Sequence, residues 1–324
     1  MNDQPRPIAI YYEHQNWFRP LFDELDRRGV PYVRIDARQH QYDTAASDSE
    51  YALFFNRMSP SAYRRGNAQG ILYTLSYLAH LERQGVRVVN GYRAFSFEIS
   101  KAMQLSLLEQ LGLRYPRARV INHPAQAPGA AQEIGFPVVV KPNIGGSGAG
   151  IVRYDSLQSL EAAVWQGQLD LGLDQTALVQ EYIPARDGAI TRVEVLGGKY
   201  LYAIQVFLSG DTFDLCPADI CKAADGTELV RTACAVDAPK TGLRVQGYSP
   251  PSEVIHNVER IMHAAGIEVG GVEYIVDERD ARLLYYDINA LSNFVADGPR
   301  VIGFNPYARL ADYLVAESRI AVVA

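Results

Sequence analysis

Oxygen-bearing side chains near the carboxyl-terminal end of the sequence have the spacing of a metal site. Asp287 and Asn289 lie in the apolar run 283–290, and Glu273 precedes them. Alternate residues of a strand face the same side of a sheet, so Asp287 and Asn289 are expected to share a face, with Glu273 on the other strand of an antiparallel hairpin. Two carboxylates and an amide oxygen suit Mg²⁺, with Mn²⁺ as an alternative. A solvated hairpin with charged edges is the competing interpretation.

A lysine followed by several glycines predicts a turn that binds phosphate. Lys141 ends an apolar strand, and the segment 145–150 after it is rich in glycine. Glycine lets backbone N–H groups approach phosphate oxygens and tolerates positive φ, while lysine supplies a point charge. The segment lacks the Gly-Lys-Ser/Thr of a Walker A loop, and it precedes a strand, unlike a dinucleotide fingerprint. A tight structural turn is the alternative.

A basic segment after a predicted strand is a candidate for recognising a carboxylate. The segment 56–67 carries Arg57, Arg64 and Arg65, which we interpret as contacts to an acidic substrate. A solvated helix start would have the same composition. The segment 213–221 is a further candidate for lining the site. Its Cys216 has no matching His/Asp arrangement, so it is not expected to be a nucleophile.

The elements that must position these residues fall into two groups. The first hundred residues alternate strand and helix, which predicts an α/β domain with a mostly parallel sheet covered on both faces. Its strands are expected at 7–12, 31–36, 51–57 and 86–90, and its helices at 17–29, about 72–85 and 94–112. Ligands gather at the carboxyl ends of parallel strands, and two such ends carry Asn56–Arg57 and Asn90–Gly91.

The rest of the chain is richer in strands and predicts an α+β arrangement. Strands are expected at 136–141, 177–183, 190–196, 199–207, 271–276 and 282–288, and helices near 252–265 and 306–317. The glycine-rich segment is expected to turn a hairpin. We predict three units, with boundaries at residues 1–93, 94–184 and 185–324.

Composition and charge exclude several classes of protein. The 324 residues carry a net charge of −6 and no concentrated basic stripe, so nucleic acid is not an expected partner. No run approaches the roughly 20 apolar residues of a membrane helix. The start of the sequence lacks the features of a signal peptide, which predicts a cytoplasmic protein. An odd count of three cysteines argues against a disulfide framework.

These pieces, in this order, resemble the ATP-grasp superfamily, and within it glutathione synthetase and the RimK-type ligases. The resemblance covers about residues 86–317 and rests on Lys-Pro with the glycine hairpin, Gln-Glu-Tyr-Ile at 180–183 and the late Asp-x-Asn. It implies an N-terminal parallel-sheet domain followed by a two-lobed ATP-grasp fold. It also implies ATP and Mg²⁺ as cofactors and a homo-oligomer.

The resemblance also implies roles for individual residues. Lys101 matches a lysine that contacts the α-phosphate, and Lys141 matches one that reaches phosphate and adenine N7. Arg192 matches an arginine that binds the carboxylate substrate and its acyl phosphate. The remaining matches are the lid (Gly145, Gly146, Ser147, Gly148), the adenine hinge (Gln180, Glu181 as a polar partner, Tyr182, Ile183) and the magnesium ligands (Glu273, Asp287, Asn289).

The chain departs from the family pattern near the acceptor pocket. Relatives often have Glu-x-Asn where this chain has Asp287-x-Asn289, and Asp where it has Glu273. Many have Asp-Ile-Arg before the arginine, whereas here Thr191 precedes Arg192, and Asp187 is the candidate for the missing carboxylate. The segment 290–294 replaces the usual small-Pro-Gly, so the substrate cannot be copied from a relative.

The function expected from these residues is an ADP-forming ligase. It would activate a carboxylate as an acyl phosphate and join it to an amine on amino acids or a small peptide, with small-molecule substrates as its partners. The sequence identifies no general base. Two alternatives stay open, namely an ATP-grasp kinase that phosphorylates a hydroxyl and a non-catalytic ATP-binding module.

Overall fold

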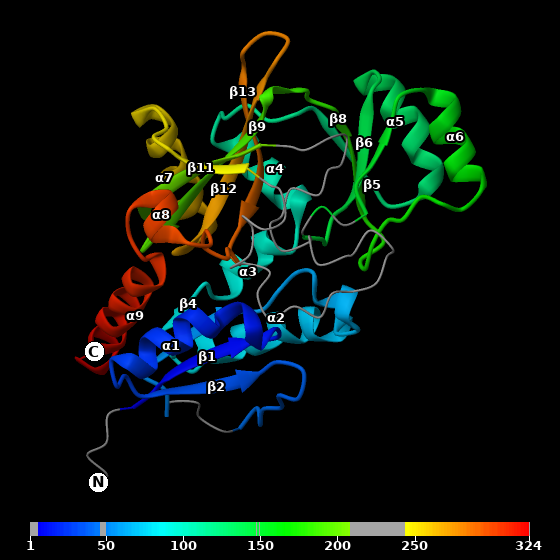
Figure 1. The fold of residues 1–324 in the computed structure, drawn as a ribbon. Helices are drawn as coiled ribbons and strands as arrows, with labels where there is room; N and C mark the ends of the chain where they lie inside the picture. The colour runs from blue at the N-terminus through cyan, green and yellow to red at the C-terminus, as the bar shows by residue number, and fades with distance from the viewer. Residues whose placement is uncertain (1–5, 46–49, 147, 149, 208–243, 324) are drawn as a thin grey trace.

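The computed structural model describes residues 6–45, 50–146, 148, 150–207 and 244–323 (Figure 1). Within these residues the strands form three sheets, one parallel and two antiparallel. The predicted combination of an α/β N-terminal part and a strand-rich remainder is confirmed. The cysteines and the segment 213–221 lie outside the described residues.

Sheet A forms the N-terminal part, with strand order β2-β1-β3-β4 and parallel pairing throughout. Its strands are β1 (Ile8–Tyr12), β2 (Tyr32–Asp36), β3 (Leu53–Arg57) and β4 (Val88–Val89). Its helices are η1 (Gln15–Phe18), α1 (Arg19–Arg27), η2 (Ala62–Arg65) and α2 (Ala68–Arg83). Every residue of β1 and β3 is buried, which agrees with the apolar run of β1 and the apolar first three residues of β3.

The helix predicted over 94–112 is two helices, α3 (Tyr92–Glu98) and α4 (Lys101–Gln110). Ser100 adopts an extended conformation, and its side chain accepts the N–H of Met103. A serine in this position satisfies an N–H group that the first turn of a helix leaves unpaired, so it starts a new helix. The break makes Lys101 the first residue of α4.

Sheet B has the order β5-β8-β6-β7, with α5 and α6 on one face. Its elements are β5 (Ala118–Ile121), η3 (Pro124–Gln126), α5 (Ala127–Ile134), β6 (Val138–Pro142), β7 (Val152–Tyr154), α6 (Leu157–Trp165) and β8 (Ala177–Glu181). Strands β6 and β7 pair antiparallel across the glycine-rich segment, so the predicted hairpin is confirmed.

Sheet C is antiparallel, with the order β11-β10-β9-β12-β13. Its strands are β9 (Ala185–Leu196), β10 (Lys199–Phe207), β11 (Arg244–Tyr248), β12 (Val269–Asp277) and β13 (Leu283–Asn289). The remaining helices are α7 (Ser252–Ala265), α8 (Gly298–Ile302) and α9 (Pro306–Val323). Strands β12 and β13 form the predicted hairpin.

The last helix ties sheet A to sheet C. In Figure 1, α9 lies beside α1, and Leu310, Ala311 and Leu314 of α9 belong to one apolar core with residues of β1, β3, β9 and β10. Sheet B has its own core with α5 and α6. Sheets A and C are therefore joined by shared apolar packing, while sheet B packs mainly on itself. Among the described residues, no helix has the length and apolar character needed to cross a bilayer.

Substitution of Leu314 tests the core shared by sheets A and C, because this side chain is fully buried in that core. We expect Leu314→Ala to lower the free energy of unfolding by about 2–5 kcal/mol, the range for a truncated core leucine. Leu72→Ala on α2, where the side chain is 53% exposed, should change it by no more than about 0.5 kcal/mol. Urea titration of both variants measures the difference, and equal effects would contradict the shared core.

Candidate active site

Three strands of sheet C place charged side chains in one row. Arg192 of β9 pairs in register with Glu273 of β12, which pairs with Asp287 of β13. A bulge follows Glu273, and bulges often re-aim side chains beside active sites. Asn289 follows Asp287 on the same face of β13, opposite Gly271. The structure therefore brings together the residues that the sequence predicts for metal and carboxylate binding.

Lys101 reaches this row from α4. Its Nζ lies 2.7 Å from Oδ1 of Asp287, and the side-chain amide of Asn289 donates to Oδ2 of Asp287 at 3.2 Å. Burial opposes the charge of each partner, yet their attraction raises the pKa of Lys101 and lowers that of Asp287. Both groups are therefore charged in the folded protein.

Lys141, the second predicted lysine, is buried at the end of β6. Within the described part of the chain, no hydrogen bond or ion pair to its Nζ is found. Burial lowers its pKa to about 7, and the positive charge of Lys101 acts in the same direction, opposed by Asp287 and Glu273. A buried ammonium without a direct partner favours an anion such as phosphate beside it.

The guanidinium of Arg192 is held by partners on three sides. Nε donates to Glu194 at 2.5 Å, Nη1 to Glu273 at 3.1 Å, and Nη2 to the hydroxyl of Ser292 at 2.7 Å. Ser292 in turn donates to the second carboxylate oxygen of Glu194. The carboxylate beside Arg192 is thus Glu194, whereas the sequence analysis named Asp187, which is exposed on β9.

Two consecutive glycines make room for this arrangement. A Cβ at Gly271 would lie 2.9 Å from Oε2 of Glu194, and a Cβ at Gly270 would collide with the carbonyl of Asn289. Glu194, which is 1% exposed, is not among the site residues predicted from the sequence. Its signal was an acidic residue two positions after Arg192 in an apolar strand, together with Gly270-Gly271 at the start of the hairpin.

The segment after Asn289 is held by two buried charged residues from outside sheet C. Glu98 of α3 accepts the backbone N–H groups of Ala290 and Leu291, and burial raises its pKa to about 7. Arg57 of β3 donates to the carbonyl of Ser292 at 2.5 Å and to that of Ala290 at 3.5 Å. These bonds fix the segment that replaces the family's small-Pro-Gly. The sequence analysis did not identify Glu98 either.

The three arginines predicted for substrate binding lie in different surroundings. Arg57 is 4% exposed, contacts the rings of Phe18 and Phe55, and has its pKa lowered by burial to about 10. Arg65 forms an ion pair with the buried Glu13, with a shortest distance of 2.6 Å. Arg64 is exposed. Arg57 and Arg65 thus have partners inside the protein, and Arg64 is the most accessible.

The predicted lid adjoins the N-terminal part. Gly145 is buried, and a Cβ at Gly146 would contact Ser61 and Pro60, which follow β3. Gly148 has φ +71°, a conformation that favours glycine. Ser147 lies outside the described residues. The described part of the turn therefore lies between β6 and the loop that leaves sheet A.

The predicted adenine hinge runs from the end of β8. Gln180 is 6% exposed, and its buried Oε1 has no hydrogen-bond partner among the described residues. Glu181 lies between Arg117 and Arg279, at 3.2 and 3.0 Å. Tyr182 packs under Arg153, and Ile183 is buried. Gln180 therefore offers an unpaired acceptor on the strand next to β6, while Glu181 is occupied by arginines.

The donor set on β12 and β13 fits a hard divalent cation. Among the described residues no cluster of three or more His, Cys, Asp and Glu side chains could hold a metal, so a protein-only cage is absent there. Glu273, Asp287 and Asn289 instead supply two carboxylates and an amide oxygen on one face. Mg²⁺ commonly binds through one or two carboxylates and takes its other ligands from phosphate and water.

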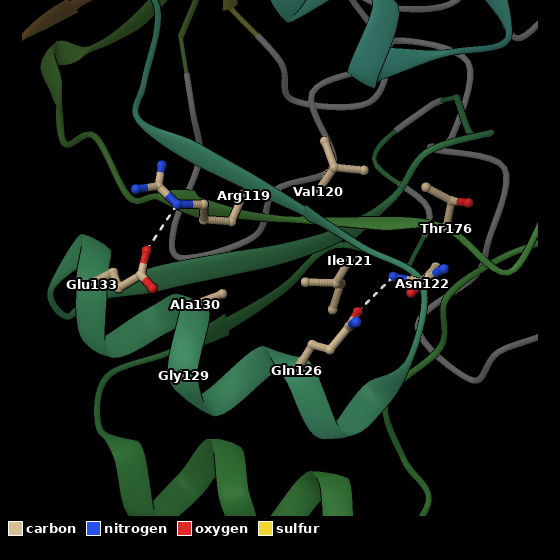
Figure 2. A pocket seen from close by; sticks show the side chains of 9 residues that line it. All are labelled: Arg119, Val120, Ile121, Asn122, Gln126, Gly129, Ala130, Glu133 and Thr176. Carbon is tan, nitrogen blue, oxygen red and sulfur yellow. Dashed lines mark hydrogen bonds and ion pairs between the residues drawn. The ribbon is translucent and has the colours of Figure 1, made fainter.

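An open pocket elsewhere on the protein lies between β5 and α5 of sheet B. Figure 2 shows Arg119 joined to Glu133 and the backbone of Asn122 joined to Gln126. The lining residues are Arg119, Val120, Ile121, Asn122, Gln126, Gly129, Ala130, Glu133 and Thr176. None of the side chains predicted for chemistry lines this pocket, so the pocket does not include the row on sheet C.

Comparisons with known proteins show that this fold is that of an ATP-grasp enzyme. The RimK-like ATP-grasp domain matches residues 99–213. A probable alpha-L-glutamate ligase of Teredinibacter turnerae is 30% identical over 289 residues, which cover 82% of this chain and 92% of that protein. A D-alanine–D-alanine ligase of Ectopseudomonas mendocina is 31% identical over 220 residues, which cover 68% of this chain and 64% of that protein.

Solved structures share the fold along nearly the whole chain. The ATP-grasp ligase PsnB complexed with minimal precursor has a TM-score of 0.67 at 18% identity, covering 97% of this chain and 100% of that chain. A RimK domain ATP-grasp protein of Sphaerobacter thermophilus has a TM-score of 0.66 at 19% identity, covering 95% and 98%. The chain belongs to the ATP-grasp family of carboxylate–amine ligases. The ADP-forming ligase class predicted from the sequence is confirmed at this level.

The lowered pKa of Lys141 predicts a pH dependence of stability. The folded protein loses this proton near pH 7, whereas the unfolded chain keeps it up to the ordinary lysine range. The unfolded state therefore binds more protons between these limits, and stability should rise with pH there. Lys141→Met should remove this contribution.

The measurement is urea unfolding without nucleotide at about pH 7.5 and about pH 9.5, comparing the pH-dependent gain of the wild type with that of Lys141→Met. Lys199→Met, at a side chain that is 78% exposed, serves as the matched control and should behave as the wild type. A wild-type gain no larger than that of Lys141→Met would show that folding does not lower the pKa of Lys141.

Because Glu194 is buried beside Arg192, we expect its substitution to lower the stability of the protein strongly. Glu194→Ala removes the buried carboxylate that accepts from Nε of the partly buried Arg192. The free energy of unfolding should fall by about 3 kcal/mol, toward the lower end for a broken buried pair, because Arg192 is 14% exposed and Glu273 still faces its Nη1. Glu133→Ala breaks the exposed pair with Arg119 and should cost less than about 1 kcal/mol. Thermal or urea unfolding distinguishes the two, and similar losses would contradict the burial of Glu194.

Proposed function

We propose that this ATP-grasp ligase uses ATP to activate the carboxylate of an amino acid or small peptide as an acyl phosphate and joins it to an amine. The observation that carries the proposal is the row Arg192–Glu273–Asp287 on sheet C, with Lys101 bound to its end. The row combines an arginine suited to a carboxylate with oxygen ligands suited to a cation.

The buried cations and the hinge support ATP as the nucleotide. Lys101 and Lys141 would bind phosphate oxygens, and Lys141 has no direct counter-ion among the described residues. The unpaired Oε1 of Gln180 is an acceptor that matches the exocyclic amino group of adenine. The glycine turn would cover the phosphates and exclude water, which protects an acyl phosphate from hydrolysis. PsnB has been solved with Mg and ADP.

Glu273, Asp287 and Asn289 are the residues that we propose to hold Mg²⁺. When bound, the ion neutralises charge that develops on the transferred phosphoryl group. The side chains themselves are already oriented by the protein, since Tyr286 donates to Glu273 at 2.8 Å and Asn289 donates to Asp287. Such supporting bonds tune and fix metal ligands.

Arg192 is the residue that we propose to bind the substrate carboxylate. A carboxylate oxygen attacks the γ-phosphorus of ATP and ADP leaves; the amine nitrogen then attacks the acyl carbon and phosphate leaves. The names of the relatives, a glutamate ligase, a D-alanine–D-alanine ligase and a ligase bound to a precursor, support amino acids or peptides as substrates. Among the arginines after β3, exposed Arg64 suits contact with substrate, and Arg57 suits support of residues 290–292.

Further features of the proposal follow the same family. We propose the cytoplasm as the compartment and a homo-oligomer as the assembly. We also propose the units 1–93, 94–184 and 185–324, which contain sheets A, B and C in turn. Helix α9 of the third unit packs against α1 of the first, and α4 of the second packs with residues of sheet C. Small-molecule carboxylates and amines are the proposed partners.

The experiment that tests the function measures ADP release from Mg-ATP with pooled amino acids and small dicarboxylic acids, followed by mass spectrometry. We expect ADP only when an acid and an amine are both present, together with a condensed product. A stable phosphoester would instead identify a kinase, and AMP would refute the acyl-phosphate route.

A matched pair of aspartates on the same hairpin tests the site. Asp287→Asn removes a carboxylate from the row and should lower turnover at least about 100-fold. Asp280→Asn changes an exposed aspartate in the turn between β12 and β13 and should leave turnover unchanged. Equal turnover by the two variants would place the metal and phosphate chemistry elsewhere.

A further inference from the structure

Asn143 is a buried polar residue to which the sequence analysis gave no role. It directly follows β6, two positions after Lys141, and is 6% exposed. Its backbone N–H donates to the carbonyl of Thr176 at 2.9 Å, which continues the pairing of β6 with β8. Its position in sheet B is therefore fixed with that of Lys141.

The backbone and side chain of Asn143 also bind the first turn of α4. The carbonyl accepts the N–H of Lys101 at 3.3 Å, and Oδ1 accepts the N–H of Ala102 at 2.9 Å and the hydroxyl of Ser100 at 3.3 Å. The first N–H groups of a helix have no partner within the helix. Asn143 thus caps α4 from a different sheet and contacts the residues on both sides of Lys101.

Asp174 fixes the orientation of the Asn143 amide. Nδ2 donates to a carboxylate oxygen of Asp174 at 2.7 Å, while Oδ1 faces the two donors on α4. A rotated amide would place its NH₂ group against the N–H of Ala102 and its oxygen against a carboxylate. One arrangement of the side chain is therefore strongly preferred.

We propose that Asn143 is a positioning residue that sets the distance and orientation between Lys101 and Lys141. The inference rests on the proposed function, in which both lysines bind the phosphates of ATP. The backbone N–H of Lys101 donates to Asn143, and its Nζ donates to Asp287. Lys141 belongs to β6, the strand that Asn143 directly follows. Lys101 lies on α4 and Lys141 on β6 of sheet B. The hydrogen bonds from α4 to Asn143 join these two elements and thereby align the two lysines.

The first test is the affinity for Mg-ATP, measured by calorimetry without an acid substrate. Asn143→Ala should raise the Kd for Mg-ATP at least about 10-fold. Asn122→Ala, at an exposed asparagine that follows β5 of the same sheet, should leave it unchanged. Leu314→Ala serves as a second control, because it destabilises the protein without touching this region.

A compensating pair separates positioning from a general loss of structure. Asn143→Asp keeps an acceptor for α4 but sets two carboxylates against each other, so it should weaken Mg-ATP binding. Asn143→Asp combined with Asp174→Asn restores a donor and an acceptor between positions 143 and 174, and the Kd should return to within about 3-fold of the wild type.

A second cycle asks whether Asn143 acts through Lys101. In a Lys101→Met background, Asn143→Ala should weaken Mg-ATP binding much less than it does in the wild type, because the group that it positions is gone. Equal weakening in both backgrounds would overturn the inference.

The outcomes distinguish this inference from the proposed function. A wild-type protein that does not bind Mg-ATP refutes the proposed function and, with it, the basis of the inference. A wild type that binds, with Asn143→Ala binding equally well, overturns the role of Asn143 and leaves the proposed function standing. Failure of the compensating pair to restore binding also overturns it.

Discussion

Charge compensation on the buried face of sheet C is the constraint on which the rest of the structure depends. Removing a charged group from water without a partner is strongly unfavourable. Asp287 is therefore joined to Lys101, and Arg192 to Glu273, Glu194 and Ser292. Lys101 comes from α4, whereas Arg192, Glu273 and Asp287 lie on the three strands β9, β12 and β13. A change in the register of sheet C or in the position of α4 would therefore separate charged partners.

The packing of the three sheets follows from this requirement. Sheets A and C share an apolar core through α9, and Glu98 and Arg57 reach from outside sheet C to hold the segment 290–292. Sheet B has a separate core and is joined to the row through β6 and Asn143. Sheets A and C thus hold the residues that we propose for the carboxylate and the metal, while sheet B carries Lys141 and the glycine turn.

The same arrangement explains why membership in the ATP-grasp family does not determine which acid and which amine are the substrates. The two lysines, Glu273, Asp287 and Asn289 are the residues that we propose for the nucleotide and the cation. The segments 290–294 and 56–67 are the ones that we propose to lie near the acid and the amine, and the segment 290–294 departs from the family pattern. Glu194 and Ser292 orient Arg192, so they would shape the site that we propose for the substrate carboxylate.

The sequence by itself determined the features that depend on local spacing. The alternation of strand and helix predicted sheet A, the glycines after Lys141 predicted the β6–β7 hairpin, and Asp287-x-Asn289 predicted a shared face on β13. Tertiary structure alone decided the break at Ser100 and the capping of α4 by Asn143. It also decided the burial of Arg57 and the partners of Arg192. These features depend on contacts between residues far apart in the chain. Local periodicity cannot predict which distant donor will bond a given buried acceptor.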